Sequence, residues 1–164
     1  MLIKGLIEED FTNYKKPCMY IAFPYCDFKC CRDAGCAICQ NSALANEENV
    51  EISNIEIISR YAKNPITKAI VLAGLEPFDS PIALPQFIEE ARAITNDDIV
   101  IYTGYTEEEL TCSFNSLKNA YEKIKQYKNI IIKFGRFIPN QEKHYDEVLG
   151  VELASPNQYA RRIS

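Results

Sequence analysis

Cysteine is the residue type whose number and spacing first suggest chemistry in this sequence. The chain has seven cysteines, and five of them fall within fourteen positions, at Cys26, Cys30, Cys31, Cys36 and Cys39. Thiolates are soft ligands that suit an iron–sulfur cluster, and four of them satisfy tetrahedral Zn²⁺ equally well. The odd count and the adjacent Cys30–Cys31 pair argue against a disulfide framework. The spacing therefore predicts a metal site and leaves iron–sulfur and zinc open.

A second chemical feature is the tetrapeptide Gly-Leu-Glu-Pro at residues 74–77. Gly74 permits a close backbone approach or a positive φ after an apolar run, and Pro77 stiffens the exit. The carboxylate of Glu76 could hold an ammonium group through charge-assisted hydrogen bonds. The alternative is a helix-entry turn with a solvated glutamate. The single histidine, His144, excludes a Cys₂His₂ zinc finger and leaves Ser-His-Asp chemistry unsupported.

Short apolar runs alternate with amphipathic segments along the chain. The runs are nearly continuous, as in strands that are covered on both faces of a parallel sheet. We expect strands at residues 19–23, 69–73, 99–103, 130–134 and 151–154, with a further edge strand at residues 2–7. Capping boxes at Ser53–Glu56 and Thr106–Glu109 predict two helix starts. The expected core faces of the helices are Ile55, Ile58 and Ala62; Leu84, Phe87, Ile88, Ala91 and Ile94; and Leu117, Tyr121, Ile124 and Tyr127.

This order of elements predicts an α/β fold over residues 1–164 as a single domain. Repeated β-α-β units imply right-handed crossovers and a parallel sheet of five to six strands, which forms an open, partial (βα) barrel. Chemistry in such sheets lies beyond the carboxyl ends of the strands. The cysteine loop, the 74–77 turn and the segment Thr103–Tyr105 each follow a predicted strand. We therefore expect all three on one rim.

Composition excludes several classes of partner. The net charge is −5, and no block rich in Lys and Arg appears, so we expect no binding to nucleic acid. No apolar run approaches the ~18 residues of a membrane span, and the acidic N-terminus does not resemble an export signal. We expect a cytoplasmic protein that does not bind membranes.

The combination of these motifs resembles the radical S-adenosylmethionine (SAM) superfamily. The likeness is greatest to the small activating proteins of anaerobic ribonucleotide reductase, and it covers nearly the whole chain. Three departures from the family pattern stand out, the third of them at Phe134. The contiguous C-x3-C-x2-C motif is split here by five residues between Cys30 and Cys36, and Leu75 replaces the second glycine of Gly-Gly-Glu-Pro. The matching segments are Cys26–Cys30, Cys39–Asn41, 74–77, 99–105, 134–137 and 154–158, in which Phe134 replaces an aspartate.

The resemblance implies a set of site residues. Three thiolates, from Cys26, Cys30 and Cys39, would hold a [4Fe–4S] cluster whose fourth iron chelates SAM. Cys39 is chosen because Gln40–Asn41 follows it as in the family, and Cys36 is the fallback. Glu76 would receive the methionine ammonium, beside Gly74. The remaining cofactor-binding positions that the resemblance implies are Ile38, packed on the adenine, and Thr103 and Asn157, on segments that face the cofactor.

The implied activity is reductive cleavage of SAM to a 5′-deoxyadenosyl radical, which makes the protein an oxygen-sensitive oxidoreductase. The expected partners are a glycyl-radical enzyme, such as anaerobic ribonucleotide reductase, as the protein substrate and an external one-electron reductant. The interrupted cysteine motif keeps a second interpretation open. The same fold could carry a non-catalytic Fe–S or zinc module for electron transfer, in which a fourth thiolate closes the site.

Overall fold

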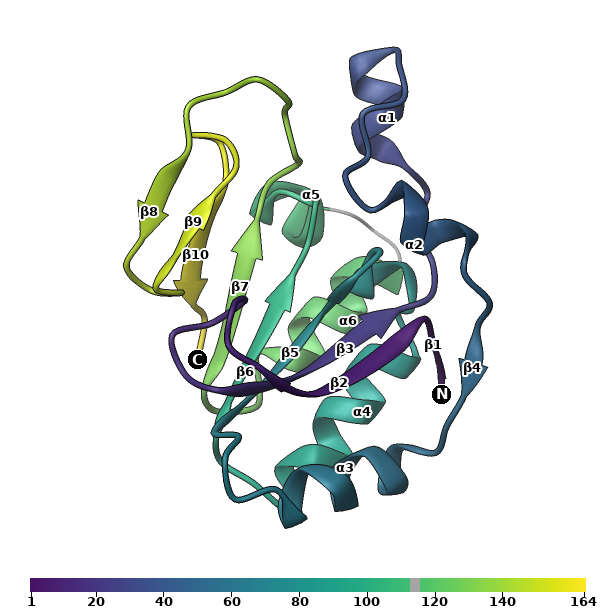
Figure 1. Cartoon of the computed structure of the whole chain (residues 1–164), viewed down its shortest axis with the longest axis vertical. Helices are drawn as coiled ribbons and strands as arrows, with labels where there is room; N and C mark the ends of the chain where they lie inside the picture. The colour runs from purple at the N-terminus through teal and green to yellow at the C-terminus, as the bar shows by residue number, and fades with distance from the viewer. Residues whose placement is uncertain (113–115) are drawn as a thin grey trace.

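The computed structural model describes residues 1–112 and 116–164. Its centre is a six-stranded sheet in the order β10-β7-β6-β5-β3-β2 (Figure 1). The four middle strands are parallel, and the two edge strands run antiparallel to their neighbours. The parallel strands are β3 (Cys18–Phe23), β5 (Ala69–Gly74), β6 (Asp98–Tyr102) and β7 (Ile130–Phe134), and the edges are β2 (Gly5–Asp10) and β10 (Tyr159–Arg162).

The two faces of the sheet are covered by different kinds of structure. Alternate strand residues such as Ile70, Leu72 and Ile101 pack with the crossover helices in one core cluster. The other face, with Val71 and Val100, packs against Tyr14 and the hairpin of β8 (His144–Asp146) and β9 (Val151–Leu153). The crossover helices are α3 (Asn54–Lys63), α4 (Ala83–Arg92), α5 (Glu107–Cys112) and α6 (Ser116–Ile124). Coverage of both faces explains the unbroken apolar runs.

The predicted strand at residues 151–154 is not part of the central sheet. It forms β9 of the short hairpin, and Tyr159–Arg162 provides the sixth strand instead. The edge strand β10 reads Tyr-Ala-Arg-Arg, so it lacks the apolar run that marks the inner strands. The predicted strand at residues 2–7 is divided between β1 (Leu2–Ile3), which pairs with β4 (Val50–Glu51), and β2. The sheet is thus mixed at its edges, and the strands described do not close into a barrel.

Two predicted helix faces are partly wrong. In α3 the buried residues are Ile57, Ile58 and Tyr61, whereas Ile55 is 76% exposed and Ala62 is also exposed. The buried residues and the predicted ones both recur at intervals of three to four, so the sequence alone does not show which of the two faces contacts the sheet. In the segment after α4, Ile94 is likewise exposed. Within the described part of the chain, no helix has the length and apolar character needed to cross a membrane.

The short elements gather at the carboxyl end of the parallel strands. After β3 come α1 (Lys29–Ala34) and α2 (Ser42–Asn46), and after β5 comes the 3₁₀ turn η1 (Pro77–Asp79). Figure 1 shows α1 standing beyond this end of the sheet, above α5. The predicted gathering of the three unusual segments on one rim is therefore confirmed.

Candidate iron–sulfur and cofactor site

A cavity of about 210 Å³ lies where the parallel strands β5, β6 and β7 end. Three thiols from the cysteine loop line it, those of Cys26, Cys30 and Cys39. Cys31 and the exposed Cys36 are not among the residues that line it. The structure thus brings together the three cysteines chosen from the sequence, although they are spread over fourteen positions. Their role as ligands stays a prediction.

Burial favours the neutral form of two of these thiols, those of Cys26 and Cys30, in the ligand-free protein. Burial raises the pKa of Cys26 to about 12, although its sulfur accepts a hydrogen bond from Phe28 N at 3.2 Å. Burial also raises the pKa of Cys30, against the opposing effects of the Phe137 amide and the Arg136 guanidinium. A bound metal deprotonates its thiol ligands, so metal binding here releases protons. Soft sulfur donors facing one cavity are a set that suits an iron–sulfur cluster.

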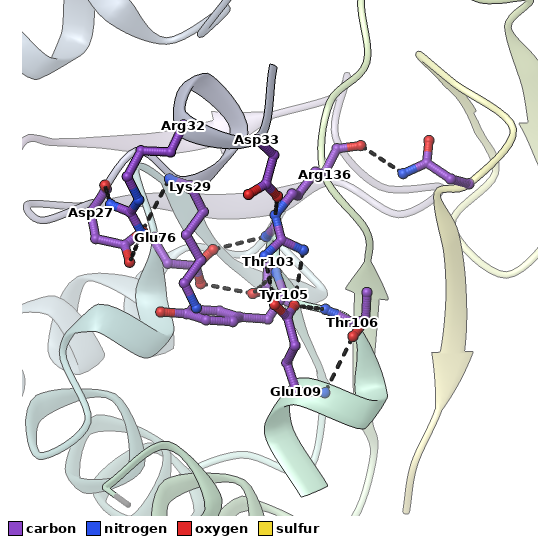
Figure 2. Close-up of polar contacts among 12 residues, drawn as sticks. Asp27, Lys29, Arg32, Asp33, Glu76, Thr103, Tyr105, Thr106, Glu109 and Arg136 are labelled. Carbon is purple, nitrogen blue, oxygen red and sulfur yellow. Dashed lines mark hydrogen bonds and ion pairs between the residues drawn. The ribbon is translucent and has the colours of Figure 1, made fainter. Parts of the chain in front are cut away.

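Glu76 is a buried carboxylate on the wall of the same cavity, only 5% exposed. Its Oε1 accepts hydrogen bonds from Thr103 Oγ1 at 2.8 Å and from Phe78 N at 3.1 Å, and its Oε2 accepts one from Gly104 N at 2.8 Å. Figure 2 shows the contact between Glu76 and Thr103. Burial nevertheless raises the pKa of Glu76 to about 7. A cation in the cavity would stabilise the ionised form.

Lys133 is a site residue that the sequence motifs did not indicate. It lies near the end of β7, is 7% exposed, and lines the cavity together with the thiols and Glu76. Its Nζ donates to Gly135 O at 2.8 Å, and burial lowers its pKa to about 8. Lysine is almost never fully buried unless its charge is paired. The sequence does carry a signal, since Lys133 interrupts the apolar run Ile-Ile-Ile-Lys-Phe.

A second cavity of about 400 Å³ continues from the first toward the β8–β9 hairpin. Both cavities are lined by Lys133, Tyr102 and three side-chain amides, those of Asn13, Gln40 and Gln158. Because they share these five lining residues, the two cavities adjoin each other between the cysteine loop and β9, and together they are called the cleft below. One end of the cleft therefore offers thiols and a carboxylate, and the other offers amides and an ammonium group.

The remaining predicted residues differ in where they lie. Gly74 has φ +85°, and a Cβ there would lie 2.6 Å from Ala22 Cα, so glycine is required for the approach of β3 to β5. Its carbonyl accepts a hydrogen bond from Asn41 Nδ2 at 2.6 Å, which ties the end of the cysteine loop to the sheet. Ile38 and Asn157 do not line either cavity. Asn157 is exposed, and its Nδ2 donates to Arg136 O at 2.9 Å.

Three comparisons with known proteins bear on this site. A family model described as "4Fe-4S single cluster domain" matches residues 18–155, which includes the cysteine loop, Glu76 and Lys133. A search of curated proteins found no match, and a search of solved structures found none either. The family match covers most of the chain. The chain therefore belongs to the 4Fe-4S single cluster domain family, whose members bind one [4Fe–4S] cluster.

Proposed function

We propose that this protein is a radical SAM enzyme. The observation that carries the proposal is the composition of one cavity, in which three thiols face a buried carboxylate and a buried ammonium group. Three thiolates leave one iron of a [4Fe–4S] cluster without a protein ligand, which is the vacancy that SAM chelation requires. Radical SAM proteins carry the domain to which this chain belongs.

Glu76 and Lys133 have the charges that the methionine part of SAM requires. The carboxylate of Glu76 would bind the ammonium group, and Thr103 and Gly104 fix its orientation through their hydrogen bonds. An ammonium group has three N–H donors, and Gly135 O takes one of those of Lys133. The others can reach a carboxylate in the cleft. Ligand binding would then neutralise two buried charges at once, which offsets the cost of burying them.

A cluster held by these thiolates would, once reduced, supply the electron for cleavage of SAM to methionine and a 5′-deoxyadenosyl radical. The chain itself positions the ligand and limits the access of water to it. The amides of Asn13, Gln40 and Gln158 lie in the adjoining cavity, where they can hydrogen-bond the nucleoside part of SAM.

The proposal extends to the partners. The motif likeness to activating proteins of anaerobic ribonucleotide reductase favours a glycyl-radical enzyme as the acceptor, with an external one-electron reductant. A large protein substrate would cover the cleft at the carboxyl ends of the parallel strands. Anaerobic co-purification of a glycyl-radical protein with this chain, and a glycyl EPR signal after turnover, would test that extension.

The test of the enzymatic function is product formation. Protein reconstituted anaerobically with iron and sulfide, then given dithionite and SAM, should release 5′-deoxyadenosine. The Cys39→Ala variant should give none, and the Cys36→Ala variant should match the wild type. A fully loaded cluster that yields no 5′-deoxyadenosine with any reductant would contradict the proposal. So would one zinc ion per chain after anaerobic purification, without visible Fe–S absorbance, because that result identifies a closed thiolate site.

A further inference from the structure

Helix α1, which carries Cys30, does not pack a buried side chain against the core. None of its six residues, all of them described, is buried. The helix starts after Phe28, whose φ is +55°, and stops at Gly35, whose φ is +66°. Since packing against the core does not hold α1, polar contacts must fix the position of Cys30 over the cavity.

Apart from the bond to the Cys30 thiol, three contacts among the described residues connect the α1 segment to the rest of the protein. Figure 2 shows the contact between Asp33 and Arg136. The amide of Asp27 donates to Asp79 Oδ2 at 2.7 Å, and the Lys29 ammonium lies 3.9 Å from the centre of the Tyr105 ring. The third contact is an ion pair between Asp33 Oδ2 and Arg136 Nε, at 2.7 Å. By contrast, Arg32 pairs with Asp27 inside the same loop, so that pair cannot hold the loop to the core.

Arg136 is the most firmly held of these groups. Its two terminal nitrogens bind both oxygens of Glu109, at 2.9 and 2.6 Å, and its side chain is 17% exposed. Glu109 is itself fixed by the capping box, in which it accepts from Thr106 N at 2.8 Å. On the other side, the Arg136 carbonyl accepts from Asn157. A bidentate arginine with all these contacts is a rigid support for Asp33.

The same segment also reaches the thiol. The amide of Phe137, the next residue, donates a hydrogen bond to Cys30. The Arg136 side chain lies near the same thiol, since a Cβ built at Gly104 would be 3.7 Å from Cys30 Sγ and 3.9 Å from Arg136 Cγ. We propose that Arg136 is a positioning residue, which docks α1 on α5 through Asp33 and Glu109 and places a positive charge beside Cys30. The attachment of α1 to α5 does not depend on a bound cluster. The influence of the Arg136 charge on the cluster does depend on the proposed function.

If these contacts hold α1 in place, removing them should raise the rate of hydrogen exchange of the α1 amides. Asp33 is 59% exposed, and an ion pair at such a site changes an equilibrium by at most about fivefold. Asp33→Asn should therefore speed hydrogen exchange of the α1 amides by about three- to fivefold in the full-length, anaerobically purified protein. Arg136→Gln should have a larger effect, since it also removes the two hydrogen bonds from Arg136 to Glu109. Exchange of wild-type α1 should rise with salt, which screens exposed pairs.

The matched control is Arg32→Gln, on the same helix. It removes a pair that lies within the loop, so exchange of the α1 amides should change less than about twofold. Unfolding midpoints of all variants establish that they fold, and Asp33→Asn, at an exposed position, keeps the test valid if Arg136→Gln does not fold. Wild-type exchange rates in Asp33→Asn would overturn the docking. They would leave the proposed SAM chemistry untouched, because this measurement needs neither cluster nor cofactor.

The charge effect has a separate readout, the reduction potential of the reconstituted cluster. Reduction adds a negative charge, which a nearby cation stabilises and a nearby anion destabilises. Arg136→Gln should therefore lower the potential, Asp33→Asn should raise it, and Arg136→Lys should stay closer to the wild type than Arg136→Gln does. Loosening of α1 alone would shift the first two variants in the same direction. A common direction would overturn the assignment of the charge effect to Arg136.

Discussion

Replacing Lys133 with methionine should stabilise the ligand-free protein and weaken SAM binding. Burial lowers the lysine pKa from 10.5 to about 8, which corresponds to a penalty of about 3 kcal/mol for the charged form at neutral pH. Methionine keeps the length and the apolar character of the side chain. The loss of the hydrogen bond to Gly135 O reduces this gain in stability by about 1 kcal/mol. The free energy of unfolding should therefore rise by about 2 kcal/mol at pH 7.

The stability difference between Lys133→Met and the wild type should depend on pH in a defined direction. Lysine is protonated in both the folded and the unfolded state below pH 8, so the full penalty applies there. Between pH 8 and 10.5 the unfolded state binds more protons than the folded state, and the wild-type protein gains stability as the pH rises. The advantage of Lys133→Met should shrink over this interval and disappear above it.

Urea denaturation at pH 7 and at pH 10 measures the stability, and titration of the anaerobic, cluster-loaded protein measures SAM binding. Loss of a charge-assisted hydrogen bond should weaken binding about 10- to 100-fold. Lys63→Met, at an exposed position of α3, is the control and should leave both quantities nearly unchanged. A destabilised Lys133→Met variant would contradict the burial penalty, and unchanged affinity for SAM would refute the assignment of Lys133 as a ligand-binding group.

Three further predictions concern the thiols, the cavity wall and the opposite end of the sheet. Cys39→Ala should lose most of its iron and sulfide while Cys36→Ala keeps them, and the reverse pattern would move the third ligand to Cys36. Gly104→Ala places a methyl 3.7 Å from Cys30 Sγ, at ordinary contact distance, so the free energy of unfolding should change by less than about 0.5 kcal/mol while SAM affinity falls. Burial acts to raise the pKa of Asp98, but its hydrogen bonds from Lys16, Arg162 and Tyr14 lower it to about 2, so Asp98→Asn should lose about 2 kcal/mol at neutral pH. Denaturation curves should show this loss disappearing as the pH falls from about 4 to about 2, and a loss that persists at pH 2 would contradict the electrostatic origin of the effect.

The inner strands could be predicted because both of their faces are covered. Residues such as Val71 on one face and Leu72 on the other are fully buried, so the apolar run is continuous and easily recognised. The edge strand Tyr159–Arg162 has exposed residues and gives no such pattern. The capping box of Thr106 and Glu109 was recognised correctly because it depends on residues three apart, and both of its hydrogen bonds form.

The site was only partly predictable, because much of it depends on contacts between distant segments. Cys39 was chosen from its neighbours in the sequence, and the structure shows a physical basis for that choice in the bond from Asn41 to Gly74 O. The Arg136–Asp33 pair joins residues about a hundred positions apart, so the spacing of nearby residues cannot predict it. Sequence motifs do not indicate Lys133, because the signal of its strand comes from the apolar residues around it.

The central claim is that three thiolates leave one iron of the cluster open to SAM. The most direct measurement is electron-nuclear double resonance on the reduced, reconstituted protein with SAM labelled with ¹⁷O in its carboxylate. We expect a ¹⁷O coupling to the cluster, which disappears when unlabelled SAM is used. A fully loaded and reduced cluster that shows no coupling at saturating SAM would contradict the claim, because its fourth iron would then be held by another ligand.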